Sequence, residues 1–461
     1  MIFKNLLLSF QLENYKNIRF LKFIYTHPKF WIFGSKRQVL EYTSKAKLIL
    51  LLTILLLVFD IAASIYFTSG ILEIISVIGV ILFLPIYFVI ANIILTPLDR
   101  YLKNRIILSA TKKISKYKNL KIIAITGSYG KTTTKEILAT ILTESYNVLM
   151  TEGTKNTPLG ISRLINTQLS ESHDIFIVEM GAYMPGDIKE LCDIVGPNIS
   201  VLTGITLQHL ERFKNLDNII DAKFEILEAL RENDFAVVDS STHGVKKGLE
   251  TKKLEVKNII QVDELLPYTY KENLSGMIFK LGESTIETKL LADYMGNTLQ
   301  ICHEISKYLG QDFLEFQRGV SKIDFVPHRM ELIYNPSSNV YIIDDSFNGN
   351  LQGVESILTL MQHAPFTGRK ILIAGGIVEL GNELVPTHLK LGRQMGRVAD
   401  LVLLVEGPIG NTLKKGLLDS GYSLNNIKLY PTPLALHEDL KNITQNGDMI
   451  VFQNDLPDNY L

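Results

Sequence analysis

Cysteine is scarce in this sequence. Among 461 residues only Cys192 and Cys302 occur, without CxxC spacing, which argues against a disulfide framework and a cysteine-ligated zinc site. An overall positive charge is also missing, because 47 Lys and Arg residues nearly cancel 48 Asp and Glu residues. The chain therefore lacks the basic excess of a general nucleic-acid binder, and we expect no nucleic-acid partner. With 46% hydrophobic residues, it is long and apolar enough for two or three domains of roughly 100–200 residues each.

Charge is unevenly distributed along the chain. Residues 1–47 carry nine Lys or Arg against two Asp or Glu, and residues 98–120 carry seven against one. Between them, residues 48–97 carry only Asp60 and Glu73. The first 120 residues thus have a net charge of +11, and the remaining 341 have −12.

Two apolar runs, Leu48–Phe67 and Ile71–Leu95, lie between these basic segments. Each is long enough to cross a hydrocarbon core of about 30 Å, and the three residues between them allow only a tight turn. The sequence therefore predicts a transmembrane helical hairpin, with Pro85 kinking the second helix. The positive-inside rule places both flanks, the N-terminus and the following domains in the cytoplasm of a multi-pass membrane protein. A buried hairpin in a soluble core is the alternative.

The basic flanks also contain aromatic residues such as Tyr15, Phe20 and Trp31. Their simplest role is to lie against the anionic headgroups of membrane lipid. A more specific alternative is recognition of a phosphorylated lipid substrate.

A glycine-rich loop opens the part of the chain that follows. Lys121–Thr126 predicts a buried strand, and Lys135–Leu142 has helical spacing. Such a loop surrounds a polyphosphate with backbone N–H groups at the positive end of a helix. Lys131 would reach the β- and γ-phosphates, and Thr132 would offer a hydroxyl to Mg²⁺. The sequence therefore predicts ATP binding by Gly127, Ser128, Tyr129, Gly130, Lys131, Thr132 and Thr133.

The loop GSYGKTTTK lacks the first glycine of the general phosphate-loop pattern, since Ile125 occupies that position. This short form resembles the Mur ligase family, ATP-dependent amide-forming enzymes of cell-wall peptide assembly that include the folylpolyglutamate synthases. The segments EMGA at 179–182, HLE at 209–211 and AKFE at 222–225 follow in the family's order. The resemblance implies that Thr132 and Glu179 bind one Mg²⁺, that His209 binds a second, and that Lys223 is carbamylated. A carbamate turns a cation that would repel Mg²⁺ into an anion with oxygen donors.

The loop GTKNTPLG at 153–160 is similar to the family's substrate-facing loop. By this resemblance Thr154, Asn156 and Thr157 would bind substrate. A turn rich in Pro, Gly and Asn could have the same composition for structural reasons alone.

The C-terminal part continues the resemblance. VPHRME at 326–331 is similar to the family's PHRxE segment, and Arg329 would approach the terminal phosphate. Asn297, near the start of a helix expected at 298–309, would face adenine. DDSFNGN at 344–350 and GGIVELG at 375–381 resemble the branch that adds D-alanyl-D-alanine to muramyl peptides. Asp345 would then bind ribose, and Asn348 and His388 substrate.

Two segments depart from the family. Its N-terminal domain, which grips a UDP-sugar precursor, has no visible counterpart, and the hairpin with its basic flanks stands in its place. The chain ends in QNDLPDNYL, where the branch usually has a KGS segment. Acceptor identity is therefore less well determined than nucleotide chemistry.

We expect an α/β protein with a P-loop ATPase-type central domain at 121–327 and a smaller Rossmann-like domain at 328–461. These domains follow a basic cytosolic segment at 1–47, the hairpin at 48–97 and a basic juxtamembrane linker at 98–120. The expected function is ATP-dependent ligation of a muramyl-peptide carboxylate to D-alanyl-D-alanine, with two Mg²⁺ ions and carbamylated Lys223. The acceptor would be UDP-linked or lipid-linked. One alternative is a tethered ligase that adds or amidates a different amino acid on a lipid-linked acceptor, and another is a non-catalytic nucleotide-binding protein.

Overall fold

The computed structural model describes residues 2–13, 15–30, 39–153, 155–207, 210–347 and 349–453. Thr154, His209 and Asn348, each predicted to be a site residue, lie outside the described residues. The chain divides into two compact units, residues 1–108 and 109–461. The division falls inside helix α6, within the stretch predicted to be a linker, and this helix continues to Ile114.

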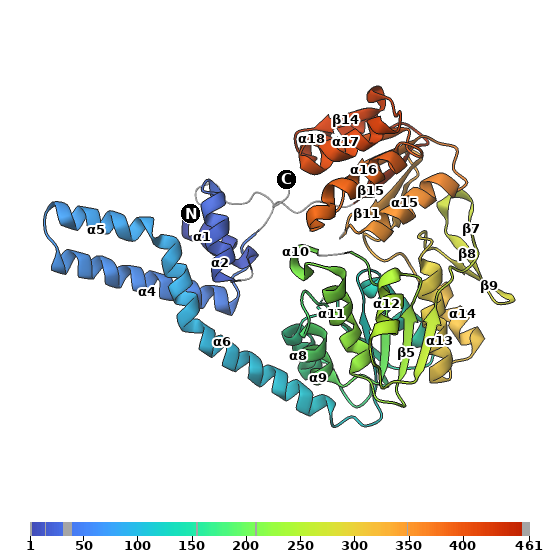
Figure 1. The fold of residues 1–461 in the computed structure, drawn as a ribbon, viewed down its shortest axis with the longest axis horizontal. Helices are drawn as coiled ribbons and strands as arrows, with labels where there is room; N and C mark the ends of the chain where they lie inside the picture. Colours follow the sequence, from blue (N-terminus) through green and yellow to red (C-terminus); the bar gives the residue numbers. More distant parts are fainter. Residues whose placement is uncertain are drawn as a thin grey trace. The chain divides into compact units, whose positions relative to one another are not determined.

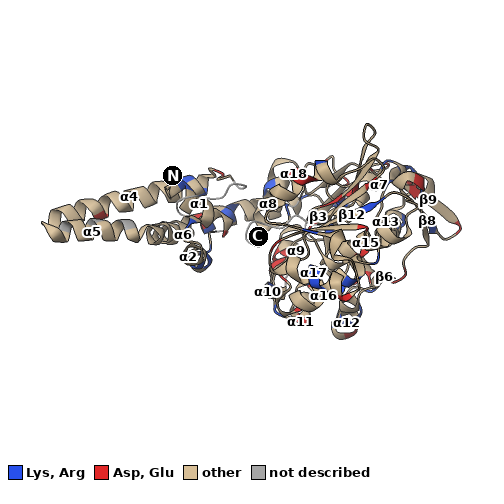
Figure 2. Ribbon diagram, turned by 90° about the horizontal axis from the view of Figure 1, so that it is seen from above, with Lys and Arg blue, Asp and Glu red and all other residues tan. Residues whose placement is uncertain are grey.

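The first unit is helical. Its helices are α1 (Ile2–Leu12), α2 (Asn17–Thr26), α4 (Ser44–Phe67), α5 (Ile71–Leu82) and α6 (Leu84–Ile114). The N-terminal segment is more than a charged flank, because α1 buries Leu6, Leu7 and Phe10 in a core shared with Ile49 of α4 and Phe88 of α6. The long apolar helices carry few basic residues: α4 has only Lys45 and Lys47, both in its first turn, and α5 has none (Figure 2).

Helix α4 is long and apolar enough to cross a membrane, and α5 lies beside it (Figures 1 and 2). The second predicted span is not one straight helix. Ile74–Val80 and Leu84–Ile114 are bent by 58° and pass the same length test only as a pair. The break immediately precedes Pro85, whose ring disfavours a helical conformation in the residue before it and whose nitrogen lacks a hydrogen. The predicted kink is therefore confirmed.

The second unit begins with a parallel sheet in the order β2-β3-β1-β4-β5-β6, covered by helices on both faces (Figure 1). Apolar β-branched residues fill β1, the central strand, as both faces are buried. The predicted strand at 121–126 is confirmed. The elements are β1 (Lys121–Thr126), α7 (Lys131–Leu142), β2 (Val148–Met150), α8 (Pro158–Thr167), β3 (Ile175–Glu179), α9 (Asp187–Val195), β4 (Ile199–Leu202), α10 (Leu210–Phe213), α11 (Leu216–Glu228), β5 (Phe235–Asp239), α12 (His243–Thr251) and β6 (Asn258–Val262).

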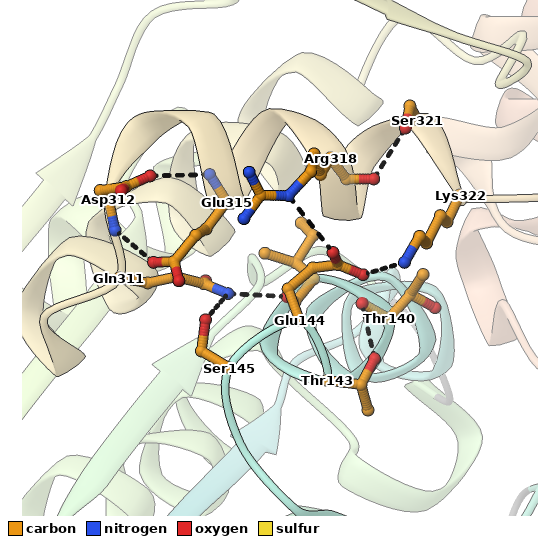
Figure 3. Close-up of polar contacts among 11 residues, drawn as sticks. Thr140, Thr143, Glu144, Ser145, Gln311, Asp312, Glu315, Arg318, Ser321 and Lys322 are labelled. Atoms are coloured by element: carbon orange, nitrogen blue, oxygen red, sulfur yellow. Dashed lines mark hydrogen bonds and ion pairs between the residues drawn. The ribbon is translucent and has the colours of Figure 1, made fainter.

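A small antiparallel sheet, β7-β8-β9, and two helices complete this domain. Their bounds are β7 (Tyr268–Tyr270), β8 (Met277–Leu281), β9 (Ser284–Thr288), α13 (Met295–Leu309) and α14 (Phe313–Ser321). Polar side chains join α14 to the end of α7 (Figure 3). Buried Gln311 donates to the Ile141 carbonyl at 3.0 Å and to Ser145 at 3.1 Å, while Glu144 pairs with Lys322 at 2.5 Å.

The C-terminal domain has a second sheet in the order β10-β11-β15-β12-β13-β14, parallel except for β10. The elements are β10 (Glu331–Asn335), β11 (Val340–Asp345), α15 (Leu351–His363), β12 (Lys370–Ala374), α16 (Leu384–Met395), β13 (Leu401–Val405), α17 (Pro408–Asp419), β14 (Ile427–Tyr430), α18 (Pro433–Ile443) and β15 (Met449–Gln453). The expected pair of α/β domains is therefore present.

Candidate active site

The candidate site lies at the carboxyl ends of β1, β3 and β4. These parallel strands are neighbours, so the segments that leave them meet at one edge of the sheet. The glycine loop follows β1, and Glu179 ends β3. Ligands of open parallel sheets bind at such an edge.

The glycine loop is shaped by close packing against the segment after β4. A Cβ atom on Gly127 would lie 2.2 Å from the Thr203 hydroxyl, so no larger residue fits there without a shift. Gly130 starts α7 with φ +72°, a left-handed conformation that glycine adopts without strain. Within the described chain, the N–H groups of Lys131, Thr132 and Thr133 have no hydrogen-bond acceptor. They form the open helix N-terminus that the phosphate-loop prediction requires.

Lys131 folds back over this loop. Its Nζ donates to the carbonyls of Gly127 at 2.8 Å and Ser128 at 3.3 Å. Desolvation lowers its pKa to about 8; nearby Glu179 opposes this shift and Arg329 adds to it. The structure thus brings the loop lysine, the strand-end carboxylate and the arginine of the C-terminal domain into one group of interacting charges.

Glu179 is 1% exposed and lies beside Thr132. The Thr132 hydroxyl donates to Glu179 Oε2 at 2.8 Å, and Asn156 Nδ2 donates to Oε1 at 3.1 Å. A Cβ atom on Gly181 would lie 2.8 Å from Asn156 Cγ, so glycine there lets the Asn156 side chain lie close to the strand end. Carboxylate and hydroxyl oxygens are the donors that Mg²⁺ prefers, so these residues fit a magnesium site.

Lys223, in α11, is 4% exposed. In the described ranges, no hydrogen bond or ion pair joins its side-chain nitrogen to another residue. Burial holds its pKa well below the usual value, and the nearby charge of Lys131 acts in the same direction. A neutral amine is the form that reacts with CO₂, so this environment suits carbamylation.

Arg329 and Asp345 come from the C-terminal domain. Arg329 lies over the Phe347 ring, 4.9 Å from its centre. Burial raises the pKa of Asp345 to about 7, although Arg329 and the Met330 N–H, at 3.2 Å, favour the ionised form. Beside them, an ion pair with Asp344 at 2.7 Å raises the pKa of His328.

Asn297 corrects one detail of the sequence analysis. Helix α13 begins at Met295, so Asn297 lies inside its first turn and not before it. Its Nδ2 donates to Asp239 at 3.1 Å, while its buried Oδ1 has no hydrogen-bond partner among the described residues. Tyr129 also donates to Asp239, at 3.4 Å. An unpaired buried amide oxygen is costly and is a natural contact for a ligand N–H group.

Two predicted substrate contacts have other partners. Thr157 caps α8, because its hydroxyl accepts the Gly160 N–H at 3.3 Å. His388 is fully buried: its Nε2 accepts the Ile377 N–H at 3.0 Å, and its Nδ1 lies 2.6 Å from the Leu384 carbonyl. As placed, His388 holds the loop after β12 in position through both ring nitrogens, and its contact with a substrate stays a prediction.

Three residues at or near the site were missed by the sequence analysis. Buried Lys135 lies 3.7 Å from Glu179, and Asp239 contacts both Tyr129 and Asn297. Arg212 pairs with Glu379 of the C-terminal domain at 2.9 Å. None of the three stands out in the sequence, since isolated lysine, arginine and aspartate side chains usually face solvent.

A cavity of about 440 Å³ opens beside Thr132 and Arg329. It extends along the outer face of α7, past Ile137, to the segment that links the two domains. Val326 and Phe347 add apolar walls. The cavity offers space for an organic substrate next to the candidate metal and phosphate groups.

Comparisons with known proteins agree with this geometry. Residues 125–295 match the Mur ligase middle domain, and residues 328–453 match the Mur ligase glutamate ligase domain. A UDP-N-acetylmuramoyl-tripeptide–D-alanyl-D-alanine ligase of Rickettsia prowazekii is 30% identical over 321 residues, 63% of this chain and 70% of that protein. The enzyme of the same name from Buchnera aphidicola is 27% identical over 328 residues, covering 68% and 70%.

Solved structures show the same fold. MurF ligase from Thermotoga maritima, in complex with ADP, has a TM-score of 0.66 and 24% identity, covering 77% of this chain and 80% of that one. MurF from Acinetobacter baumannii has a TM-score of 0.65 and 22% identity, covering 77% of each chain. Together with the sequence matches, these findings show that the chain belongs to the Mur ligase family.

Proposed function

We propose that this protein is an ATP-dependent, ADP-forming ligase that joins a muramyl-peptide carboxylate to D-alanyl-D-alanine. The observation that carries the proposal is the grouping of Lys131, Thr132, Glu179, Lys223 and Arg329 around one edge of the central sheet. The names of its relatives support the choice of both substrates.

In the proposed reaction, an oxygen of the acceptor carboxylate attacks the γ-phosphorus of ATP. The bond to the β,γ-bridging oxygen breaks, ADP leaves, and an acyl phosphate forms. The amine nitrogen of the dipeptide then attacks the acyl carbon and loses a proton, and phosphate departs from the tetrahedral intermediate. Phosphorylation is required because the oxygen of a free carboxylate is a poor leaving group.

The side chains of this chain would stabilise the charge that gathers between the two anionic substrates. Lys131 would turn from the loop carbonyls toward the β- and γ-phosphates, and Arg329 would bind the transferred phosphoryl group. Asn297 would contact adenine, and Asp345 ribose. Thr132, Glu179 and carbamylated Lys223 would hold Mg²⁺, with His209 as a further ligand. Two bound ions would offset phosphate charge.

A finer proposal concerns the acceptor. We infer that the first unit anchors the protein in the membrane as a two-helix hairpin, with the catalytic domains in the cytoplasm, and that the acceptor is lipid-linked. The exposed apolar side chains of α4 and α5, and the basic excess of residues 1–47 and 98–120, support contact with membrane lipid.

Replacing Lys223 tests the proposed site. Lys223→Ala removes the group that would carry the carbamate, so ligation should fall by about 100-fold or more. A short-chain carboxylate that enters the vacated space should restore part of the activity. Undiminished ligation by Lys223→Ala, measured as amine-dependent phosphate release, would contradict the proposed role.

A further inference from the structure

Lys135 is a fully buried lysine one turn into α7. Its Nζ donates to the Gly153 carbonyl at 2.6 Å and lies 3.3 Å from Glu136 Oε1. It also lies 3.7 Å from Oε2 of Glu179. Lysine is almost never completely buried unless it is paired, so these contacts explain how it is tolerated.

These contacts join the phosphate-loop helix to two other parts of the site. Gly153 belongs to the loop after β2, and Glu179 ends β3. Three residues beyond Gly153, Asn156 holds the other oxygen of Glu179 at 3.1 Å. The loop is therefore held beside Glu179 in two ways. The Asn156 side chain binds the Glu179 carboxylate, and Lys135 binds the loop's backbone at the Gly153 carbonyl.

The charge of Lys135 has a second consequence. Its ammonium group offsets the buried negative charge of Glu179. The other two groups that bind this carboxylate, the Thr132 hydroxyl and the Asn156 amide, are neutral. A divalent cation held by Thr132 and Glu179 would face this positive charge. Lys135 therefore cannot strengthen cation binding by direct attraction, and its contribution must come through the position of the loop.

We propose that Lys135 is a positioning residue that fixes Gly153, and with it the loop after β2, beside Glu179, so that the loop presents its polar groups to the acceptor. The inference rests on the proposed function and on the expectation from the family resemblance that this loop binds substrate. It assigns Lys135 to acceptor binding and not to nucleotide binding.

The test uses the full-length protein in detergent and the variant Lys135→Met, which keeps the length of the side chain but removes its charge. We expect the KM for UDP-N-acetylmuramoyl-tripeptide to rise about tenfold, since one charge-assisted hydrogen bond is lost on the acceptor side, and the KM for ATP to change less than about threefold. The affinity for Mg²⁺ with ADP should not fall, because the variant removes a positive charge that faces the cation. Amide hydrogen exchange in residues 151–157 should become faster. Lys135→Arg should restore part of the acceptor KM.

Glu136→Gln is the matched control, because Glu136 also contacts Lys135 but touches neither Gly153 nor Glu179 in the described structure. It should leave the hydrogen exchange of the loop unchanged. If Lys135→Met fails to fold, hydrogen exchange in Asn156→Ala provides the test, since this variant releases the other contact of the loop with Glu179 and should speed exchange at Gly153. Its acceptor KM is not the readout, because Asn156 is itself a predicted substrate contact.

Unchanged acceptor KM and unchanged loop exchange in a folded Lys135→Met protein would overturn the inference. So would an equal loss of acceptor and nucleotide affinity, which indicates general damage. If the wild-type protein forms no amide bond, the proposed function fails. Loop exchange and ADP binding still test Lys135 in that case, because neither requires turnover.

Discussion

At the scale of single residues, burial determines which groups can change charge near neutral pH. Burial raises the pKa of Asp345 to about 7 and lowers that of Lys131 to about 8. Between these values Asp345 is mostly ionised while Lys131 is still mostly protonated. An ionised carboxylate can accept hydrogen bonds from ribose, and a protonated lysine can bind phosphate. Nucleotide binding should therefore be strongest between about pH 7 and pH 8.

The affinity for ADP should therefore depend on pH, with a maximum between about pH 7 and pH 8. The ionised fraction of a carboxyl group with a pKa near 7 rises about tenfold from pH 6 to pH 8. Affinity should rise with it and fall again above pH 8, as Lys131 loses its proton. In Asp345→Asn, ADP affinity should no longer rise between pH 6 and pH 8, apart from the change caused by titration of ADP itself. Isothermal titration calorimetry of the wild-type protein and the variant over this range provides the measurement. Parallel profiles would show that Asp345 does not act through its charge.

The position of a site residue could be predicted from the sequence only where neighbouring residues in the chain determine it. The strand, glycine loop and helix around Lys131 are contiguous, so their pattern predicts their placement. The burial of His388 and Lys135 depends on distant elements, and neither residue type indicates it. Asn297 was expected just before a helix at 298–309, but the helix begins three residues earlier, at Met295.

At the scale of elements, the domains depend on contacts between helices that are far apart in sequence. Helix α14 is fastened to α7 by buried Gln311 and by a more exposed group, in which Glu144 pairs with Lys322 (Figure 3). The two kinds of contact differ in expected energy. A buried polar group left without its partner costs about 1–3 kcal/mol, whereas an exposed ion pair contributes about 0–1 kcal/mol.

Gln311→Ala should therefore lower the free energy of unfolding by about 1–3 kcal/mol, since it leaves the Ile141 carbonyl and the Ser306 hydroxyl without this partner. Lys322→Ala, whose side chain is 61% exposed, should lower it by less than about 1 kcal/mol. Urea unfolding followed by circular dichroism provides the measurement. A larger loss for Lys322→Ala would reverse this ranking.

The same scale shows why the hairpin was only partly predictable. Apolar length predicted two spans, and α4 agrees with that expectation. Pro85 predicted that the second helix would bend, because proline is a common cause of sharp kinks. The size of the bend, 58°, does not follow from the residue type. Helix α1 packs into the same unit, although its residues were read only as part of a basic flank.

At the scale of the whole molecule, a helical unit precedes two family domains. If this unit brings the active site to a membrane-bound substrate, a lipid-linked acceptor should be used at least about tenfold more efficiently than a UDP-linked one, because both partners are confined to one surface. Removing residues 1–108 should abolish that preference. The measurement is kcat/KM for both acceptors in lipid vesicles. Equal turnover of the two acceptors by the full chain would remove the reason for proposing a membrane substrate.

In the proposed function, this chain couples the formation of an amide bond to the cleavage of ATP to ADP and phosphate. Mass spectrometry of the products is its most direct test, with purified full-length protein, ATP, Mg²⁺, both muramyl-peptide acceptors and a panel of amines. We predict a product with the mass of acceptor plus D-alanyl-D-alanine minus water, together with ADP and phosphate. ADP formation without any new amide, for every amine and both acceptors, would contradict the claim.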